Sequence, residues 1–344
     1  MKLYFKFSIV FFLILLFSCS SDDSPRPELP DGDFAGGTLI LNEGGSAGGS
    51  VSFLSNDLQE LTNSIFEDNT NQQPGLFLQS IFFDDDKAFI ISNGSNLISV
   101  VNRFSFELIG TIDSGLSVPR YGVTYNGKAY VTNLDSFGEQ DDDFIAIIDI
   151  ETLEVDETVI LGTAAERILE LNGEIYVQGA VFGSGNKVVK FDPSTKTIVE
   201  TLDVGEGLNS LQKGENEIYT LDEDGLKIIN AQDFSIKSEL DKPESLGGIG
   251  NLRVDANLLY YTSGSEVYSI SKTDSELSDE PILDYGGDSD FGVFYGFEVN
   301  ESQIFIGDAG DFTSNGKVFV YSLSGQLLAE KTVGDIAPNS FYFQ

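Results

Sequence analysis

A short strand-like run recurs seven times along the chain at nearly constant spacing. Taking one marker residue from each copy gives separations of 50, 41, 46, 43, 41 and 45 residues. The markers are Leu39, Phe89, Tyr130, Tyr176, Tyr219, Tyr260 and Phe305. A period near 40 to 45 residues in a β-rich sequence is typical of a propeller, in which each repeat builds one blade. The sequence therefore predicts an all-β fold, a seven-bladed β-propeller.

Each marker run has two companions of its own. A second β-branched and aromatic run follows it, at residues 51–53, 98–101, 145–148, 188–191, 226–229, 267–270 and 318–321. An inner run precedes it and in two copies ends in Asn-Gly, at 126–127 and 172–173. Asn-Gly favours tight hairpins because both residues tolerate positive φ. The inner run is therefore expected to pair with the marker strand.

The first copy lacks an inner run, whereas residues 337–343 fit that pattern and have no marker run after them. We expect the C-terminal strand to join the first blade, which closes the ring and removes exposed sheet edges. An open solenoid would need end caps, for which the sequence offers no candidate. The propeller is expected to span residues 36–344.

The N-terminus reads as a targeting segment. Lys2 and Lys6 precede an apolar run over residues 7–17, too short for a comfortable membrane span, and the run ends at Ser18 and Cys19. Residues 1–18 are expected to be a lipoprotein signal peptide, with lipid attached to Cys19, the sole cysteine. The alternative is an ordinary signal cleavage site with a cysteine nearby. The segment resembles bacterial lipoprotein signals, and this resemblance implies an outer-membrane lipoprotein that is anchored by its lipid and exposed on the cell surface.

Residues 19–35 are polar and proline-rich and are expected to form a flexible tether. Without residues 1–18, 17 basic residues face 56 acidic ones and the formal charge is −39. A field of this sign repels phosphate backbones, so nucleic acid is not an expected partner.

Several short motifs carry a family resemblance. Residues 130–133, Tyr-Val-Thr-Asn, resemble the YVTN class of bacterial propellers. Together with residues 40–44, 118–121 and 316–321, they are similar to the YncE-like surface lipoproteins of Bacteroidota, the DUF5074 group. The resemblance covers residues 36–344 and independently implies seven blades.

The resemblance also implies a function. Well-understood members of the group capture vitamin B12 and related corrinoids and pass them to a TonB-dependent outer-membrane transporter. The first hypothesis is therefore capture of a corrinoid or another large nutrient. The alternative is a structural or adhesive surface propeller that binds protein or glycan through the same face.

A ligand is expected where the inner strands begin, because those starts and the loops after the marker strands emerge on one face. The residues at the inner-strand starts are Gln79, Arg120 with Tyr121, Arg167, Asn209, Asn251, Tyr295 and Asn339. Two arginines at equivalent positions favour an acidic or phosphate-bearing ligand. The competing interpretation is that Arg120 and Arg167 pair with neighbouring carboxylates.

The loops after the marker strands supply the remaining candidates, Glu43, Asp135, Phe137, Phe182, Asp308, Asp311 and Phe312. The three phenylalanines lie in polar loops where no strand needs them, so they are candidates for shielding an amphipathic ligand; packing within the loops is the other explanation.

The composition argues against an enzyme. The chain has no histidine, so it lacks the commonest general base and every Ser-His or Cys-His dyad. A pair of carboxylates could still cleave a glycoside, but no spacing nominates a pair. Asp141, Asp142 and Asp143, and separately Asp284, Asp288 and Asp290, could bind Ca²⁺, but neither group has the spacing of a known calcium loop, and solvated acidic loops are the favoured interpretation. No cofactor and no metal are expected.

Overall fold

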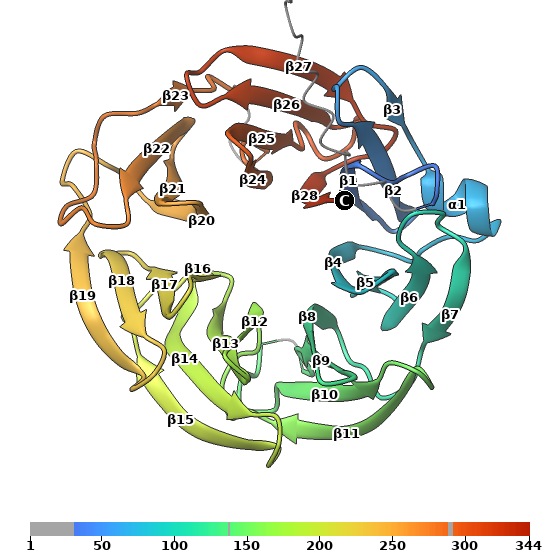
Figure 1. The fold of residues 1–344 in the computed structure, drawn as a ribbon, viewed down its shortest axis with the longest axis horizontal. Helices are drawn as coiled ribbons and strands as arrows, with labels where there is room; N and C mark the ends of the chain where they lie inside the picture. Colours follow the sequence, from blue (N-terminus) through green and yellow to red (C-terminus); the bar gives the residue numbers. More distant parts are fainter. Residues whose placement is uncertain (1–30, 137, 288–291) are drawn as a thin grey trace, which may run out of the picture.

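The computed structural model describes residues 31–136, 138–287 and 292–344. They form seven four-stranded antiparallel sheets arranged in a ring around a common axis (Figure 1). Cavities lined by residues of the inner strands lie along this axis, which we call the channel. The predicted all-β, seven-bladed propeller is confirmed. The expected signal peptide, the lipid attachment site at Cys19 and most of the expected tether lie outside the described residues.

The innermost strands of the seven blades lie around the channel. They are β28 (Pro338–Phe343), β4 (Leu78–Asp84), β8 (Pro119–Tyr125), β12 (Ile168–Leu171), β16 (Ser210–Lys213), β20 (Ile249–Asp255) and β24 (Gly296–Asn300), for blades 1 to 7 in that order.

The second strands hold the marker residues. They are β1 (Gly37–Gly45), β5 (Lys87–Ser92), β9 (Lys128–Asn133), β13 (Glu174–Val181), β17 (Glu217–Leu221), β21 (Leu258–Ser263) and β25 (Gln303–Asp308). Among the described residues these strands are almost wholly buried; Tyr176 and Tyr260 are each 1% exposed.

The third strands are β2 (Gly48–Ser55), β6 (Leu97–Asn102), β10 (Phe144–Asp149), β14 (Ser184–Asp192), β18 (Gly225–Asn230), β22 (Glu266–Ser271) and β26 (Lys317–Ser322). They coincide with the second runs of the repeat.

The outer strands are β3 (Leu61–Thr62), β7 (Leu108–Ile112), β11 (Glu154–Ile160), β15 (Thr197–Asp203), β19 (Ser235–Asp241), β23 (Leu283–Asp284) and β27 (Leu327–Thr332). The repeat analysis did not identify them. Most of their residues are exposed and polar, as β15 illustrates, so they lack the apolar signal that marks the inner three strands.

The two ends of the chain meet in blade 1. Strand β28 pairs antiparallel with β1, with Leu39 opposite Tyr342 and Ile40 opposite Phe341, and both strands lie beside the C-terminus in Figure 1. The Tyr342 hydroxyl accepts a hydrogen bond from the backbone N–H of Ile81 at 2.8 Å, which ties this strand to blade 2. The expected closure of the ring is confirmed.

The core consists of apolar clusters between neighbouring blades. One cluster joins Tyr130 and Ile147 of blade 3 to Ile175 and Phe191 of blade 4. A short helix, α1 (Ile65–Thr70), packs Ile65 and Phe66 into the apolar cluster between blades 1 and 2. In the described ranges no helix is both long and apolar enough to cross a membrane.

Candidate functional site

The starts of the inner strands and the ends of the marker strands meet at one end of the channel. Antiparallel pairing requires this, as Pro119 of β8 lies opposite Asn133 at the end of β9. We call this end the mouth. Four inner strands carry a β-bulge here, and Gln79, Arg120, Asn251 and Asn339 lie within the bulges. Bulges re-aim side chains, and they are common next to functional sites.

A cavity of about 350 Å³ opens at the mouth, and five of the seven blades line it. Its volume lies at the lower end of the range for small-molecule sites. Its lining residues are Glu43, Gln79, Asn93, Val118, Arg120, Tyr121, Leu134, Arg167, Phe182, Tyr295, Asn339 and Ser340.

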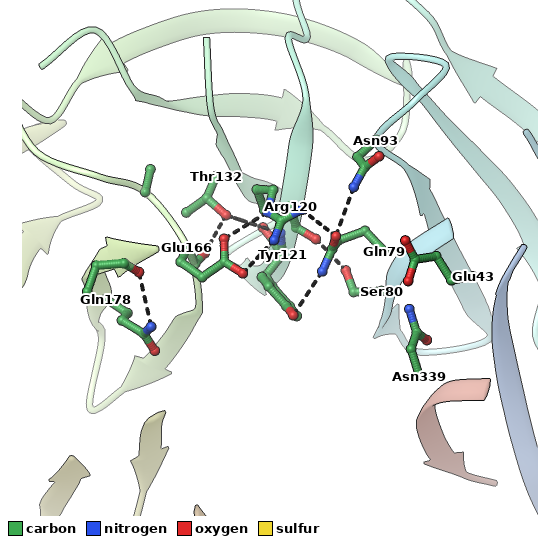
Figure 2. A network of polar contacts seen from close by, with 12 residues as sticks. Glu43, Gln79, Ser80, Asn93, Arg120, Tyr121, Thr132, Glu166, Gln178 and Asn339 are labelled. Atoms are coloured by element: carbon green, nitrogen blue, oxygen red, sulfur yellow. Dashed lines mark hydrogen bonds and ion pairs between the residues drawn. The ribbon is translucent and has the colours of Figure 1, made fainter. Parts of the chain in front are cut away.

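Arg120 is held by a dense polar network (Figure 2). It is 7% exposed and forms a two-point ion pair with Glu166, with Nε to Oε2 at 2.8 Å and Nη2 to Oε1 at 2.7 Å. A third donor, Nη1, bonds Gln79 Oε1. Burial lowers the pKa of Arg120, but the Glu166 carboxylate outweighs it and the net shift is upward. For Arg120, the competing interpretation from the sequence, pairing with a neighbouring carboxylate, is therefore confirmed.

Gln79 links this network across blade 2. Its Oε1 also accepts from Asn93 Nδ2 at 2.9 Å, and its Nε2 donates to the Tyr121 hydroxyl at 2.9 Å. All three contacts are drawn in Figure 2. The amide of Gln79 is therefore fixed in one orientation before any ligand arrives.

Arg167 differs from Arg120. Its guanidinium lies over the Tyr121 ring, 4.7 Å from the centroid, and makes no ion pair or side-chain hydrogen bond within the described residues. Arg167 and Tyr121 also line a second cavity of about 440 Å³, which runs deeper along the channel beside Phe82 and Lys213. These two side chains therefore separate the mouth from the deeper channel.

Glu43 and Tyr295 form a second polar pair on the other side of the mouth. The Tyr295 hydroxyl donates to Glu43 Oε2, and the Phe312 ring packs edge-on against Tyr295 at 5.0 Å. Burial raises the pKa of the Glu43 carboxyl, whereas the Tyr295 hydrogen bond and the charge of Arg120 partly oppose that rise.

Asn339 completes this side of the cavity. Its Nδ2 donates to the Leu78 carbonyl at 2.9 Å, which fixes the orientation of the amide. Its Oδ1 is buried and has no hydrogen-bond partner. Figure 2 places Asn339 and Glu43 together, on the side of Gln79 away from Arg120.

Two of the residues predicted at the starts of inner strands, Asn209 and Asn251, do not line the cavity. Asn209 donates to the Ile249 carbonyl at 3.0 Å and thereby links blades 5 and 6. Asn251 donates to Thr262 Oγ1 at 3.1 Å within its own blade. Neither blade contributes to the cavity at the mouth.

The loop candidates are divided among several places. Phe182 lines the mouth, is 71% exposed and lies 5.5 Å from the Arg120 guanidinium. Asp135 is exposed and does not belong to this lining. Asp308 accepts from the Tyr285 hydroxyl at 2.5 Å, and Asp311 accepts the backbone N–H groups of its own turn. Phe137 lies outside the described residues.

Five residues of the site were not predicted from the sequence. Four line the cavity and the fifth, Glu166, neutralises Arg120 from the segment before β12; the four are Asn93, Val118, Leu134 and Ser340. No pattern in the sequence singles out Glu166 among 56 acidic residues.

Metal binding finds no support in the described ranges, where no group of three or more His, Cys, Asp or Glu side chains is arranged around a common point. Asp143 is fully buried, and its carboxylate accepts backbone N–H groups of Ala165 and Asp135 at 3.0 and 3.3 Å. Asp288 and Asp290 lie outside the described residues.

Solved structures with this architecture come from diverse sources. A quinoprotein alcohol dehydrogenase-like protein from Bacteroides thetaiotaomicron has a TM-score of 0.66 at 14% identity, over 90% of this chain and 78% of that one. A functionally unknown protein from Desulfotomaculum acetoxidans has a TM-score of 0.68 at 15% identity, over 90% and 98%. The computationally designed Ika8 protein has 0.59 at 12%, over 92% and 93%. At such identities these likenesses concern the fold alone.

Curated protein sequences include no significant match to this chain. A protein family does match: residues 36–305 fit the family described as "Domain of unknown function (DUF5074)". The match begins at the first blade, covers well over half of the chain and ends within β25. This chain belongs to the DUF5074 family.

Proposed function

We propose that the protein is a binding protein, not an enzyme, and that it captures a nutrient ligand at the mouth of the propeller. The observation that carries the proposal is the cavity at the mouth, where polar side chains of five blades converge on a space of small-molecule size. Most of its polar groups are oriented by hydrogen bonds within the protein, which lowers the ordering cost of binding.

The nutrient that we favour is a corrinoid related to vitamin B12. The choice is supported by the resemblance of residues 40–44, 118–121, 130–133 and 316–321 to a group whose well-understood members capture corrinoids. A corrinoid is larger than the cavity, so one of its polar side arms would enter the mouth while the ring rests on the surrounding loops. The exposed Phe182 ring offers an apolar contact there.

The location that we propose follows from the N-terminal pattern. Residues 1–18 direct export, Cys19 carries lipid, and the propeller is tethered on the outer-membrane surface. A TonB-dependent transporter is the proposed partner that receives the ligand.

A titration of residues 31–344, which contain all seven blades, with cyanocobalamin tests the ligand. We expect saturable binding that weakens in Asn339→Leu and is unchanged in Ile160→Ala, because Ile160 is 62% exposed on an outer strand. Absence of binding to any corrinoid would discard the corrinoid and leave capture of another nutrient. A transporter gene adjacent to this one would support uptake.

A second candidate, adhesion to glycans, is favoured by a different feature. A groove of about 720 Å³ lies between blades 6 and 7, with aromatic side chains of Tyr285, Phe319 and Tyr321 beside Asp308 and Lys317. Aromatic faces beside polar groups suit sugar rings. A glycan screen of the wild type and Tyr321→Ala separates this candidate from nutrient capture, because Tyr321 lines the groove and does not line the cavity at the mouth.

A further inference from the structure

The mouth holds opposite charges that do not pair with each other. Arg167 is cationic at all relevant pH values and forms no ion pair or side-chain hydrogen bond in the described part of the chain, although the charges of Glu166 and Glu298 act on it from beyond ion-pair distance. Glu43 is acidic and forms no ion pair there; its side-chain contact is the neutral hydroxyl of Tyr295. Both line the same cavity of about 350 Å³.

The state of Arg167 is unusual for this protein. Of the other arginines that the structure describes, Arg120 and Arg253 pair with Glu166 and Glu298, and Arg103 donates to Gln344 and to the Phe343 carbonyl. Among these described arginines, Arg167 alone makes no side-chain hydrogen bond, and in a chain with 56 acidic residues this is not explained by a shortage of acceptors. Its hydrogen-bond donors are left for a group that enters the cavity.

A third group in the cavity is also incomplete. Asn339 Oδ1 is buried and accepts no hydrogen bond, although the Nδ2 contact with Leu78 holds it in place. A buried acceptor without a partner costs free energy, which a ligand donor recovers on binding. Asn339 lies beside Glu43 (Figure 2), so acceptors for an N–H group gather on that side of the mouth.

We infer that the ligand is dipolar: an anionic oxygen group, carboxylate or phosphate, binds Arg167, and an N–H donor, amide or ammonium, binds Asn339 Oδ1 and Glu43. This inference rests on the proposed function and adds the chemical class of the ligand at the same site. A guanidinium matches either oxyanion through two parallel hydrogen bonds. The Tyr121 ring already covers one face of Arg167, so the ligand approaches the edge of the guanidinium, where its donors lie.

Two small probes test the inference by calorimetric titration of residues 31–344. γ-Aminobutyrate offers a carboxylate and an ammonium, and phosphoethanolamine offers a phosphate and an ammonium. Comparing their affinities shows whether the site prefers a carboxylate or a phosphate. At least one probe is expected to bind, and acetate, phosphate and methylammonium alone are expected to bind about tenfold or more weakly. Charge-assisted hydrogen bonds predict a loss of about 10- to 100-fold in Arg167→Met, with partial recovery in Arg167→Lys.

Two further variants sharpen the result. Asn339→Leu is expected to weaken the same probe, since it removes the acceptor. Arg103→Met is the matched control: Arg103 also stacks on an aromatic ring, Phe83 at 3.9 Å, but it does not line the mouth, so binding should be unchanged. Circular dichroism and urea unfolding establish that each variant is folded.

The outcomes separate this inference from the proposed function. It is overturned if neither probe binds at millimolar concentration, or if Arg167→Met binds the probe as the wild type does. Equal binding of cyanocobalamin to the wild type and Arg167→Met would keep the proposed function and reject the role of Arg167. Arg167-dependent binding of a probe without binding of cyanocobalamin would keep the dipolar class and reject the corrinoid.

Discussion

Arg120 on β8 and Glu166, which precedes β12, join blades 3 and 4 through two parallel hydrogen bonds of 2.8 and 2.7 Å. Both side chains are mostly buried, at 8% and 12% exposure. The pair closes the wall of the mouth between two blades. It therefore contributes to the integrity of the ring as well as to the shape of the cavity.

Removing one member of this pair is expected to destabilise the fold. Arg120→Ala leaves the Glu166 carboxylate buried without its partner, and the loss of a buried partner costs about 3–5 kcal/mol. Urea unfolding measures the change. The double variant Arg120→Met with Glu166→Met is the control and should recover much of the loss, because it leaves no unpaired charge; a double variant as unstable as Arg120→Ala would contradict this account.

The closing strand gives a second prediction. Phe341 is 4% exposed and packs against Phe305 at 5.6 Å between blades 1 and 7. Phe341→Ala should lower the free energy of unfolding by about 3–5 kcal/mol, since it opens a cavity at the seam of the ring. Phe182→Ala serves as the control. Phe182 is 71% exposed, so its replacement should change the free energy of unfolding by about 0.5 kcal/mol or less.

Asp143 predicts a specific dependence of stability on pH. Burial raises the pKa of its carboxyl from 3.8 to about 6, although two backbone N–H groups oppose that rise. The folded state therefore holds a proton that the unfolded state has released. The stability from this residue is fully present below about pH 4 and is lost as the pH rises through about 6, by at most about 3 kcal/mol.

Asp143→Asn tests that dependence, because the amide does not titrate. Between about pH 4 and about pH 6 the stability of the wild type should fall relative to that of Asp143→Asn. Chemical unfolding at several pH values in this window measures the difference. A constant difference between the two proteins across the window would be incompatible with a raised pKa at Asp143.

The fold was predictable because its signals are local. The strand-like run at residues 129–132 has a counterpart in every blade, and the unmatched run at 337–343 identified the closing strand. The exposed outer strands carry no such signal. The first residues of the inner strands could be predicted by aligning the repeats. That alignment correctly predicted that Gln79, Arg120 and Tyr295 lie at the mouth.

The contacts at the mouth were not predictable because they depend on backbone detail. A bulge in β20 and a positive φ of 54° turn Asn251 toward Thr262. The pairing of Arg120 with Glu166 follows from the path of the segment before β12, as does the lack of an ion pair or side-chain hydrogen bond for Arg167 in the described residues. Sequence spacing determines which residues reach the mouth, whereas bulges and side-chain rotamers determine which of them pair within the protein and which can bind a ligand.

The Glu43–Tyr295 contact yields the last prediction. Burial raises the pKa of Glu43 and the Tyr295 hydroxyl opposes that rise, so Tyr295→Phe should raise the pKa of Glu43 further. The added cost applies only when Glu43 is ionised. Tyr295→Phe should therefore match the wild type at about pH 4 and be less stable by about 1–3 kcal/mol at about pH 7. Carboxyl ¹³C titration of Glu43 and urea unfolding at both pH values measure the two effects. An equal loss of stability at both pH values would instead assign the role of Tyr295 to packing against Phe312.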